Sequence, residues 1–193
     1  MSRRSAVNRG AFWSPRAKGL FLFATFCFAA DPATAAAPEP EGYRQKGYRS
    51  EVPATLKGAR VVSTAEARAL LDAGRTLFVD IMPRPPKPAN LPTGTVWRDM
   101  RRETIPGSHW LPNVGYGRLH PAMDGYFKTH LKRLSGGNRA KAILFFCLAR
   151  CWMSWNAAKR AQEYGYTNVI WYPGGTDGWA GAGLDLERVE PEK

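Results

Sequence analysis

Two patterns of apolar and polar positions alternate along the chain. Short apolar runs are separated by stretches in which apolar side chains recur every three or four positions, a pattern that predicts strands separated by helices. The predicted strands lie within 59–62, 76–81, 105–112, 142–146 and 168–172. The predicted helices cover 63–74, 121–134 and 154–164. This order predicts an α/β fold, with about five parallel strands and helices on both faces of the sheet.

Local motifs indicate where some of these elements begin and end. Ser63 and Glu66 have the spacing of a capping box, and Gly74 is a typical residue to follow the last turn of a helix. Five prolines lie between Pro83 and Pro92. Because proline cannot continue a helix or a central strand, 82–103 is predicted to be a long surface loop.

The first 35 residues have the composition of a cleavable signal peptide. A basic segment without acidic residues precedes the uncharged run 19–30, and small residues follow at 33–37. This apolar run is shorter than the roughly 20 residues that a membrane-spanning helix needs. We therefore expect export to the periplasm with cleavage near Ala35 to Ala37, and a mature chain without a membrane span.

Three parts are expected behind this signal peptide. Residues 36–59 are rich in proline, glycine and charge, which favours an extended N-terminal arm on the domain surface or a flexible lead. The domain itself is expected at 60–183, with a C-terminal tail at 184–193. The whole chain carries +12, and because five of its 28 basic and one of its 16 acidic residues precede position 36, the mature chain carries +8. This charge is dispersed, without a basic block or RNA-binding motif, so a nucleic-acid partner is not expected.

Cys147 and Cys151 are the two cysteines that remain after cleavage. In an oxidising compartment, two cysteines four positions apart indicate a structural disulfide, a redox pair or two ligands of a soft metal. Copper(I), held by the two cysteines with or without a histidine, is one example of such a metal. Since the pair follows the apolar strand 142–146, it is expected beyond the carboxyl end of that strand, where ligands bind in open parallel sheets. In the redox interpretation, loop amides and the next helix stabilise a Cys147 thiolate, which acts as the nucleophile, and Cys151 resolves it.

Three other residues are candidates for the same edge of the sheet. Asp80 ends the strand 76–81 and is expected to hydrogen-bond loop amides, with a role in the site as the alternative. His109 follows Gly107 in a loop, where it either reaches the cysteines or bonds a neighbouring loop. Trp152 is expected to form a wall of the site, to dock a partner or to belong to the core. No metal-ligand set or required cofactor follows from the sequence, although copper remains an alternative.

The ordered set of motifs over 60–183 resembles rhodanese-like domains. The segments 78–80 and 105–109 are similar to the two N-terminal signatures of that family. The stretch 142–179 is similar to its C-terminal half: an apolar strand, a cysteine loop, a helix with paired alanines, paired glycines and a tryptophan. The resemblance implies a single rhodanese-like domain whose cysteine loop takes part in sulfur transfer.

The loop departs from the rhodanese pattern at the position that binds the sulfur donor's anion. Rhodanese loops usually carry an arginine there, just before a serine or threonine, whereas here Met153 precedes Ser154 in a loop one residue longer. Arg150 is the remaining candidate for binding the anion, from a different position. Strong thiosulfate sulfurtransferase activity is therefore not expected, and whether the chain is an enzyme stays open.

The sequence Cys147-x-x-x-Cys151-Trp152 is similar to that of the exported CXXXCW-motif family, which is associated with alcohol oxidation by pyrroloquinoline quinone (PQQ)-dependent dehydrogenases. This resemblance implies a periplasmic accessory role, with a redox- or persulfide-active pair. It also implies a partner among alcohol-oxidation or electron-transfer proteins. The alternative is a catalytically degenerate rhodanese-like module that binds a partner protein or a soft metal such as copper.

Overall fold

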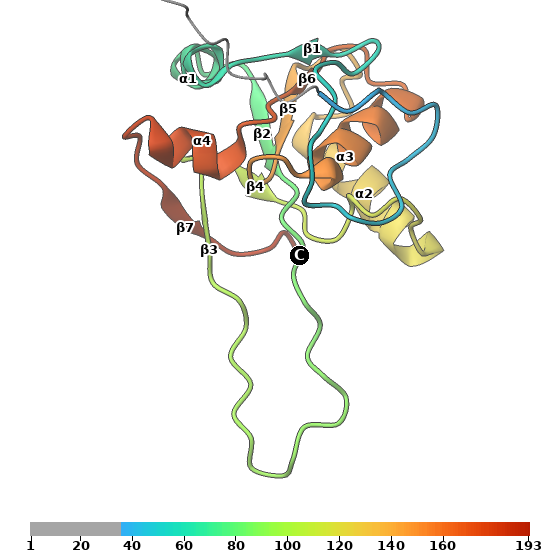
Figure 1. Ribbon diagram of the computed structural model, residues 1–193, viewed down its shortest axis with the longest axis vertical. Coiled ribbons are helices and arrows are strands. Elements are labelled where there is room, and N and C mark those ends of the chain that lie inside the picture. Colours follow the sequence, from blue (N-terminus) through green and yellow to red (C-terminus); the bar gives the residue numbers. More distant parts are fainter. Residues whose placement is uncertain (1–35) are drawn as a thin grey trace, which may run out of the picture. The chain divides into compact units, whose positions relative to one another are not determined.

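The computed structural model describes residues 36–193, and the predicted signal peptide lies outside them. Its centre is a five-stranded sheet in which every neighbouring pair of strands is parallel (Figure 1). In spatial order the strands are β1 (Arg60–Val61), β6 (Val169–Trp171), β5 (Ile143–Phe146), β2 (Leu77–Asp80) and β4 (His109–Trp110). The predicted α/β fold with five parallel strands is confirmed.

Helices cover both faces of this sheet, as predicted. One face packs against α2 (Pro121–Leu134) and α3 (Trp152–Glu163), and the other against α1 (Thr64–Asp72) and α4 (Gly175–Gly181). The capping box at the start of α1 is complete: Ser63 accepts from the backbone N–H of Glu66, whose carboxylate accepts from the backbone N–H of Ser63. These local bonds begin the helix where the sequence pattern predicts it.

The central strand β5 divides its side chains between two hydrophobic cores. Ile143 and Phe145 join the core beneath α2 and α3, whereas Leu144 and Phe146 join the core beneath α1 and α4. Successive side chains of a strand point to opposite faces, so a strand covered on both sides must be apolar throughout. All four of these side chains are fully buried.

The register of the strands aligns their carboxyl ends at one edge of the sheet. Asp80, the last residue of β2, lies opposite Phe146 of β5 on one side and Trp110 of β4 on the other. The loop after β5 begins at Cys147, so this register places the Asp80 carboxyl next to the cysteine loop.

A second, antiparallel sheet pairs β3 (Arg102–Thr104) with β7 (Glu187–Val189). Both segments lie where the sequence predicted only a loop or a tail, because neither shows apolar alternation. The chain then continues along the domain, and the backbone N–H of Glu192 donates to the carbonyl of Trp110 at 3.0 Å. The last residues are therefore packed on the domain rather than free of it.

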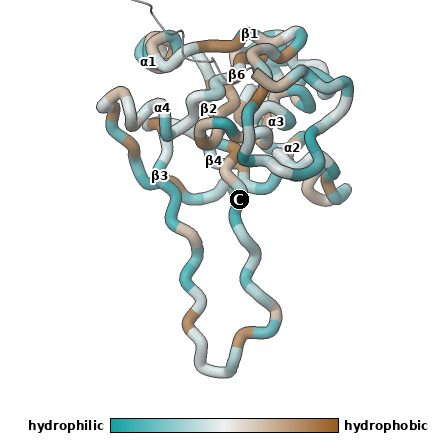
Figure 2. Tube along the Cα trace, in the orientation of Figure 1, coloured by the Kyte–Doolittle hydropathy of each residue, from teal (hydrophilic) through white to brown (hydrophobic). Residues whose placement is uncertain are grey.

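Most of the predicted proline-rich loop is a single long excursion between β2 and β3. It extends well away from the remainder of the domain and is mostly hydrophilic or neutral, with isolated apolar positions (Figures 1 and 2). One of these is Val96, which is 79% exposed. Among residues 36–193, no helix combines the length and the apolar character that crossing a membrane requires.

The segment 36–59 is an arm laid along α3, which is the first of the two alternatives left open by its composition (Figure 1). The side chain of Asn156 pairs with the backbone of Arg44 in both directions, at 3.0 and 2.9 Å. Further along, the indole of Trp155 donates to the carbonyl of Thr55 at 3.1 Å, and Leu56 is buried in the core. The arm is therefore an integral layer over the helix that begins at the cysteine loop.

Candidate functional site

The two cysteines lie in the tight turn that joins β5 to α3. Cys147 is the first residue after the strand, and Cys151 is the N-cap residue of the helix. Between them, Arg150 has φ +52°, a left-handed conformation that is uncommon for residues other than glycine. This turn reverses the chain so that Cys151 returns over Cys147. A regular helix through 147–151 would not aim the two side chains at each other.

The sulfur atoms of the pair are in direct contact. Their Sγ atoms are 2.9 Å apart, longer than the disulfide bond length of about 2.05 Å, and both residues are free thiols. Cys147 is 0% and Cys151 4% exposed. A small movement of either side chain would close a disulfide, so the fold holds a reduced pair close to bonding distance.

The pKa of Cys147 is shifted in the direction opposite to the expected one, and it is the pKa of Cys151 that is lowered. The hydrogen bond between the sulfurs, together with backbone amides that include those of Met153 and Ser154, lowers the pKa of Cys151 to about 7. The same bond, followed by burial and the nearby Asp80 carboxyl, raises the pKa of Cys147 well above its ordinary value. The largest cause of both shifts is the hydrogen bond between the two sulfurs, and the backbone amides near the start of α3 add to the lowering at Cys151.

The N-terminal arm closes over this turn. Arg49 forms an isolated antiparallel bridge with Cys151, and the backbone N–H of Trp152 donates to the carbonyl of Tyr48 at 2.9 Å. The indole N–H of Trp152 lies 3.1 Å from Ser50 Oγ and 3.0 Å from the carbonyl of Glu51. The segment 48–51 therefore covers the start of α3, next to the buried cysteine pair.

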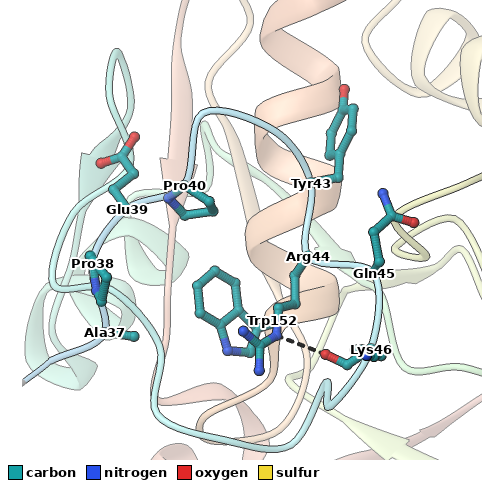
Figure 3. A pocket seen from close by; sticks show the side chains of 9 residues that line it. All are labelled: Ala37, Pro38, Glu39, Pro40, Tyr43, Arg44, Gln45, Lys46 and Trp152. Carbon is teal, nitrogen blue, oxygen red and sulfur yellow. Dashed lines mark hydrogen bonds between the residues drawn. The ribbon is translucent and has the colours of Figure 1, made fainter.

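The arm and Trp152 also enclose a surface cavity of about 450 Å³. Figure 3 shows the indole ring at its floor, with Pro38, Pro40 and Tyr43 around it and Arg44 beside the ring. The Arg44 guanidinium lies 5.1 Å from the ring centroid, a cation–π contact. Trp152 thus takes part in both the core and this cavity.

The other predicted residues of the loop face away from the two sulfurs. The Arg150 guanidinium, on a side chain that is 69% exposed, forms an ion pair with Glu51 at 2.9 Å. Met153 is buried, and the Ser154 hydroxyl donates to the carbonyl of Cys151 at 3.0 Å and accepts from the indole of Trp171 at 3.0 Å. Ser154 therefore supports the helix start, and Arg150 is held by a residue of the arm.

Asp80 belongs to a buried polar cluster behind the cysteine loop. Its carboxylate accepts from Arg102 Nε and from the Thr104 hydroxyl, both at 2.6 Å, and from the backbone N–H of Met82 at 2.9 Å. The same guanidinium reaches the carbonyl of Cys147 at 3.5 Å. Burial raises the pKa of Asp80, and Arg102, Thr104 and the Met82 amide act against that rise. Asp80 therefore holds the loop through Arg102, a residue that the sequence did not single out.

His109 bonds the C-terminal segment and not the cysteines, whereas Met82, to which the sequence assigned no role, lies beside them. The His109 ring on β4 bonds the Glu192 carboxylate at 2.5 Å, through Nδ1. In contrast, Met82 Sδ lies 3.9 Å from Cys147 Sγ. Within 36–193 there is no group of three His, Cys, Asp or Glu side chains able to hold a metal ion. The third heteroatom beside the pair is therefore a thioether, which no spacing rule in the sequence would have identified.

Comparison with known proteins gives one family match and several structural similarities. The family model Rhodanese, described as a rhodanese-like domain, matches residues 63–182. A thiosulfate sulfurtransferase from Pseudomonas aeruginosa has 18% identity and a TM-score of 0.47, over 69% of this chain and 21% of its own. This chain thus spans about a fifth of that protein. No curated protein matches it.

Two further solved structures align with similar extent. An uncharacterized protein from Saccharomyces cerevisiae has 23% identity and a TM-score of 0.42, over 66% of this chain and 98% of its own. A polysulfide-sulfur transferase homodimer from Wolinella succinogenes has 16% identity and a TM-score of 0.43, over 67% of this chain and 79% of its own.

Proposed function

The chain belongs to the rhodanese-like domain family, and on that basis we propose that it is an exported accessory protein of PQQ-dependent alcohol oxidation whose Cys147–Cys151 pair is redox- or persulfide-active. The observation that carries the proposal is the 2.9 Å contact between two free, buried thiols. A rhodanese-type reaction needs one cysteine. A second sulfur in contact with the first can attack any adduct formed on either cysteine and release it, with formation of the intramolecular disulfide.

Two routes lead to the same product. In the redox route, Cys151 as thiolate attacks a partner's disulfide, forms a mixed disulfide and releases one partner sulfur as thiolate. Cys147 then gives up its proton and attacks Cys151, which releases the second partner thiol. The partner's disulfide gains two electrons and the pair loses two.

In the persulfide route, Cys151 takes the outer sulfur of a sulfane donor such as thiosulfate, and the donor leaves as sulfite. Cys147 then attacks the inner sulfur of the Cys151 persulfide, and hydrosulfide leaves. Both routes end in a Cys147–Cys151 disulfide, which a dithiol reductant must reopen for another cycle. The arm segment 48–51 limits either reaction to reactants that can displace it.

The CXXXCW resemblance supports the placement of this chemistry in periplasmic alcohol oxidation. Trp152, the last residue of the motif, anchors the arm through its indole N–H and forms the floor of the adjoining cavity. The motif therefore joins the reactive pair to the segment that covers it. A periplasmic electron-transfer or alcohol-oxidation protein that binds the arm would expose the pair.

The test is mass spectrometry of protein purified from the periplasm, with thiols blocked at lysis. We expect interconvertible dithiol and disulfide forms that differ by two hydrogens, with a reduction potential above about −300 mV, the range of labile rather than structural disulfides. Cys147→Ser is expected to trap mixed disulfides or a persulfide on Cys151. If the pair is always oxidised and the two serine variants lose equal stability without trapping adducts, the disulfide is structural and the proposal fails.

The biological part has its own test. Deletion of the coding sequence in a bacterium that grows on an alcohol through a PQQ-dependent dehydrogenase should impair that growth. The wild-type chain should restore growth and the Cys151→Ser variant should not. Full restoration by a double cysteine variant would leave only the binding-module alternative.

A further inference from the structure

We propose that the reduced pair and Met82 form a three-sulfur site for copper(I). This site goes beyond the proposed redox function and requires the pair in its reduced, dithiol form. It consists of the thiols of Cys147 and Cys151 and the thioether of Met82. Thiolates and thioethers are the soft donors that select copper(I).

One sulfur–sulfur distance already matches that of a trigonal site. A metal about 2.3 Å from each of three sulfurs, as in a zinc–thiolate bond, separates those sulfurs by about 4.0 Å. Met82 Sδ lies 3.9 Å from Cys147 Sγ. The two cysteine sulfurs, 2.9 Å apart, need to separate by about 1 Å to reach the same spacing.

Met82 is held at this place by its backbone. Its N–H donates to Asp80 at 2.9 Å and its carbonyl accepts from the indole of Trp110 at 2.6 Å. Although the long proline-rich loop begins at the next residue, these two bonds fix Met82 at the end of β2. The thioether is thus carried by a backbone position that is bonded to Asp80 of β2 and to Trp110 of β4.

Harder ligands near the pair are already engaged. The Asp80 carboxylate accepts three hydrogen bonds, from Arg102, Thr104 and Met82. His109 is bonded to Glu192. A structural zinc site takes four nitrogen, oxygen or sulfur ligands, and in the described chain the side chains contacting the pair supply three sulfurs. This donor set matches a low-coordinate soft monovalent ion.

Copper(I) binding needs no electron transfer, and its charges balance when the two released protons are counted. One copper(I) ion replaces the protons of both thiols and the thioether donates a lone pair, so the bound site carries one net negative charge. The burial of both cysteines excludes water, which limits loss of an electron to dissolved oxygen. Occupation by the metal also prevents formation of the disulfide, because both sulfurs are used.

The experiment titrates the reduced mature chain anaerobically with copper(I) against the chromophoric chelator bicinchoninate, with X-ray absorption to count sulfur neighbours. We expect one ion per chain with three sulfur neighbours. Met82→Leu replaces the side chain by one of similar volume, a change that cores tolerate well. It should leave the ion with two sulfur neighbours and weaken copper(I) binding by about tenfold or more. The matched control is Met123→Leu, at another half-buried methionine, which should change neither value.

The outcomes separate this site from the redox proposal. If the chain holds no copper(I) against the chelator, or if Met82→Leu leaves the affinity and the sulfur count unchanged, the site is refuted. Metal-free Met82→Leu should still form and lose the Cys147–Cys151 disulfide like the wild type. If copper(I) binds as described but the pair never oxidises reversibly, the redox proposal fails and the copper site stands.

Discussion

A methyl group added at Gly175 should displace the backbone of the cysteine loop at Cys147 and Leu148. Gly175 begins α4 with φ +53°, and a Cβ atom there would lie 2.5 Å from the carbonyl oxygen of Cys147 and 2.5 Å from the carbonyl carbon of Leu148. The next residue, Thr176, donates its backbone N–H to that same Cys147 oxygen at 2.9 Å. The clash is with backbone on both counts, so no side-chain rotation can relieve it.

The cost of Gly175→Ala has two parts. A left-handed conformation costs an alanine roughly 1–2 kcal/mol, and forcing extra volume into a packed region costs about 1–3 kcal/mol. Together they predict a loss of about 2–5 kcal/mol in the free energy of unfolding. Small domains have about 5–15 kcal/mol in total, so the variant should remain folded but weakened. Displacement of Cys147 should also slow closure of its disulfide with Cys151.

The assay is urea denaturation of both proteins under reducing conditions, followed by the rate of disulfide formation at a fixed concentration of oxidant. Gly181→Ala is the matched control in the same helix, because its Cβ would meet nothing within 4 Å. It should be neutral or stabilising by up to about 1 kcal/mol. A Gly175→Ala protein within about 0.5 kcal/mol of the wild type, with unchanged oxidation, would refute this account of the loop.

Arg102→Met leaves the buried Asp80 carboxylate without its cation and should lower the free energy of unfolding by about 3–5 kcal/mol, measured by urea denaturation. The double variant Asp80→Asn/Arg102→Met should lose less, and an equal loss in the two variants would contradict this prediction. The exported chain should begin at Ala36 or Pro38 by intact-mass spectrometry, and retention of 1–35 would disprove the signal peptide. With Met153 where rhodanese loops usually carry an arginine, thiosulfate:cyanide turnover should be weak or absent in a standard assay, and ordinary turnover would show otherwise.

The fold was predictable because its determinants are local. The mostly apolar run of β2, the continuously apolar run of β5 and the Ser63–Glu66 capping box each lie within a few residues, so the pattern identifies them directly. The pairing of β3 with β7 joins segments more than 80 positions apart whose residues are largely charged. Nothing in either segment indicates its partner, and the ribbon appears only once the chain is folded.

The same distinction applies to the site. The cysteine loop was located correctly because it follows an apolar strand, whereas Met82 and Arg102 reach Cys147 across 65 and 45 positions. A methionine at a strand end and an arginine in a basic loop are common features without a spacing signature. Long-range contacts of this kind decide what surrounds the sulfurs, and the sequence alone does not encode them in a readable pattern.

The roles predicted for the two cysteines depend on where α3 begins, and the predicted and observed starts differ by two residues. With a helix start at Ser154, the free amides of the first turn would converge on the loop in general and favour the residue at the strand end, Cys147. The helix instead starts at Trp152, which makes Cys151 its N-cap. The Cys151 side chain forms no capping hydrogen bond, but the amides of Met153 and Ser154 help to lower its pKa. Helix boundaries are the least predictable feature of a sequence, since the ends fray and the competing caps differ little in energy. In this protein that small difference falls on the cysteine pair, because it decides which of the two residues lies at the start of the helix.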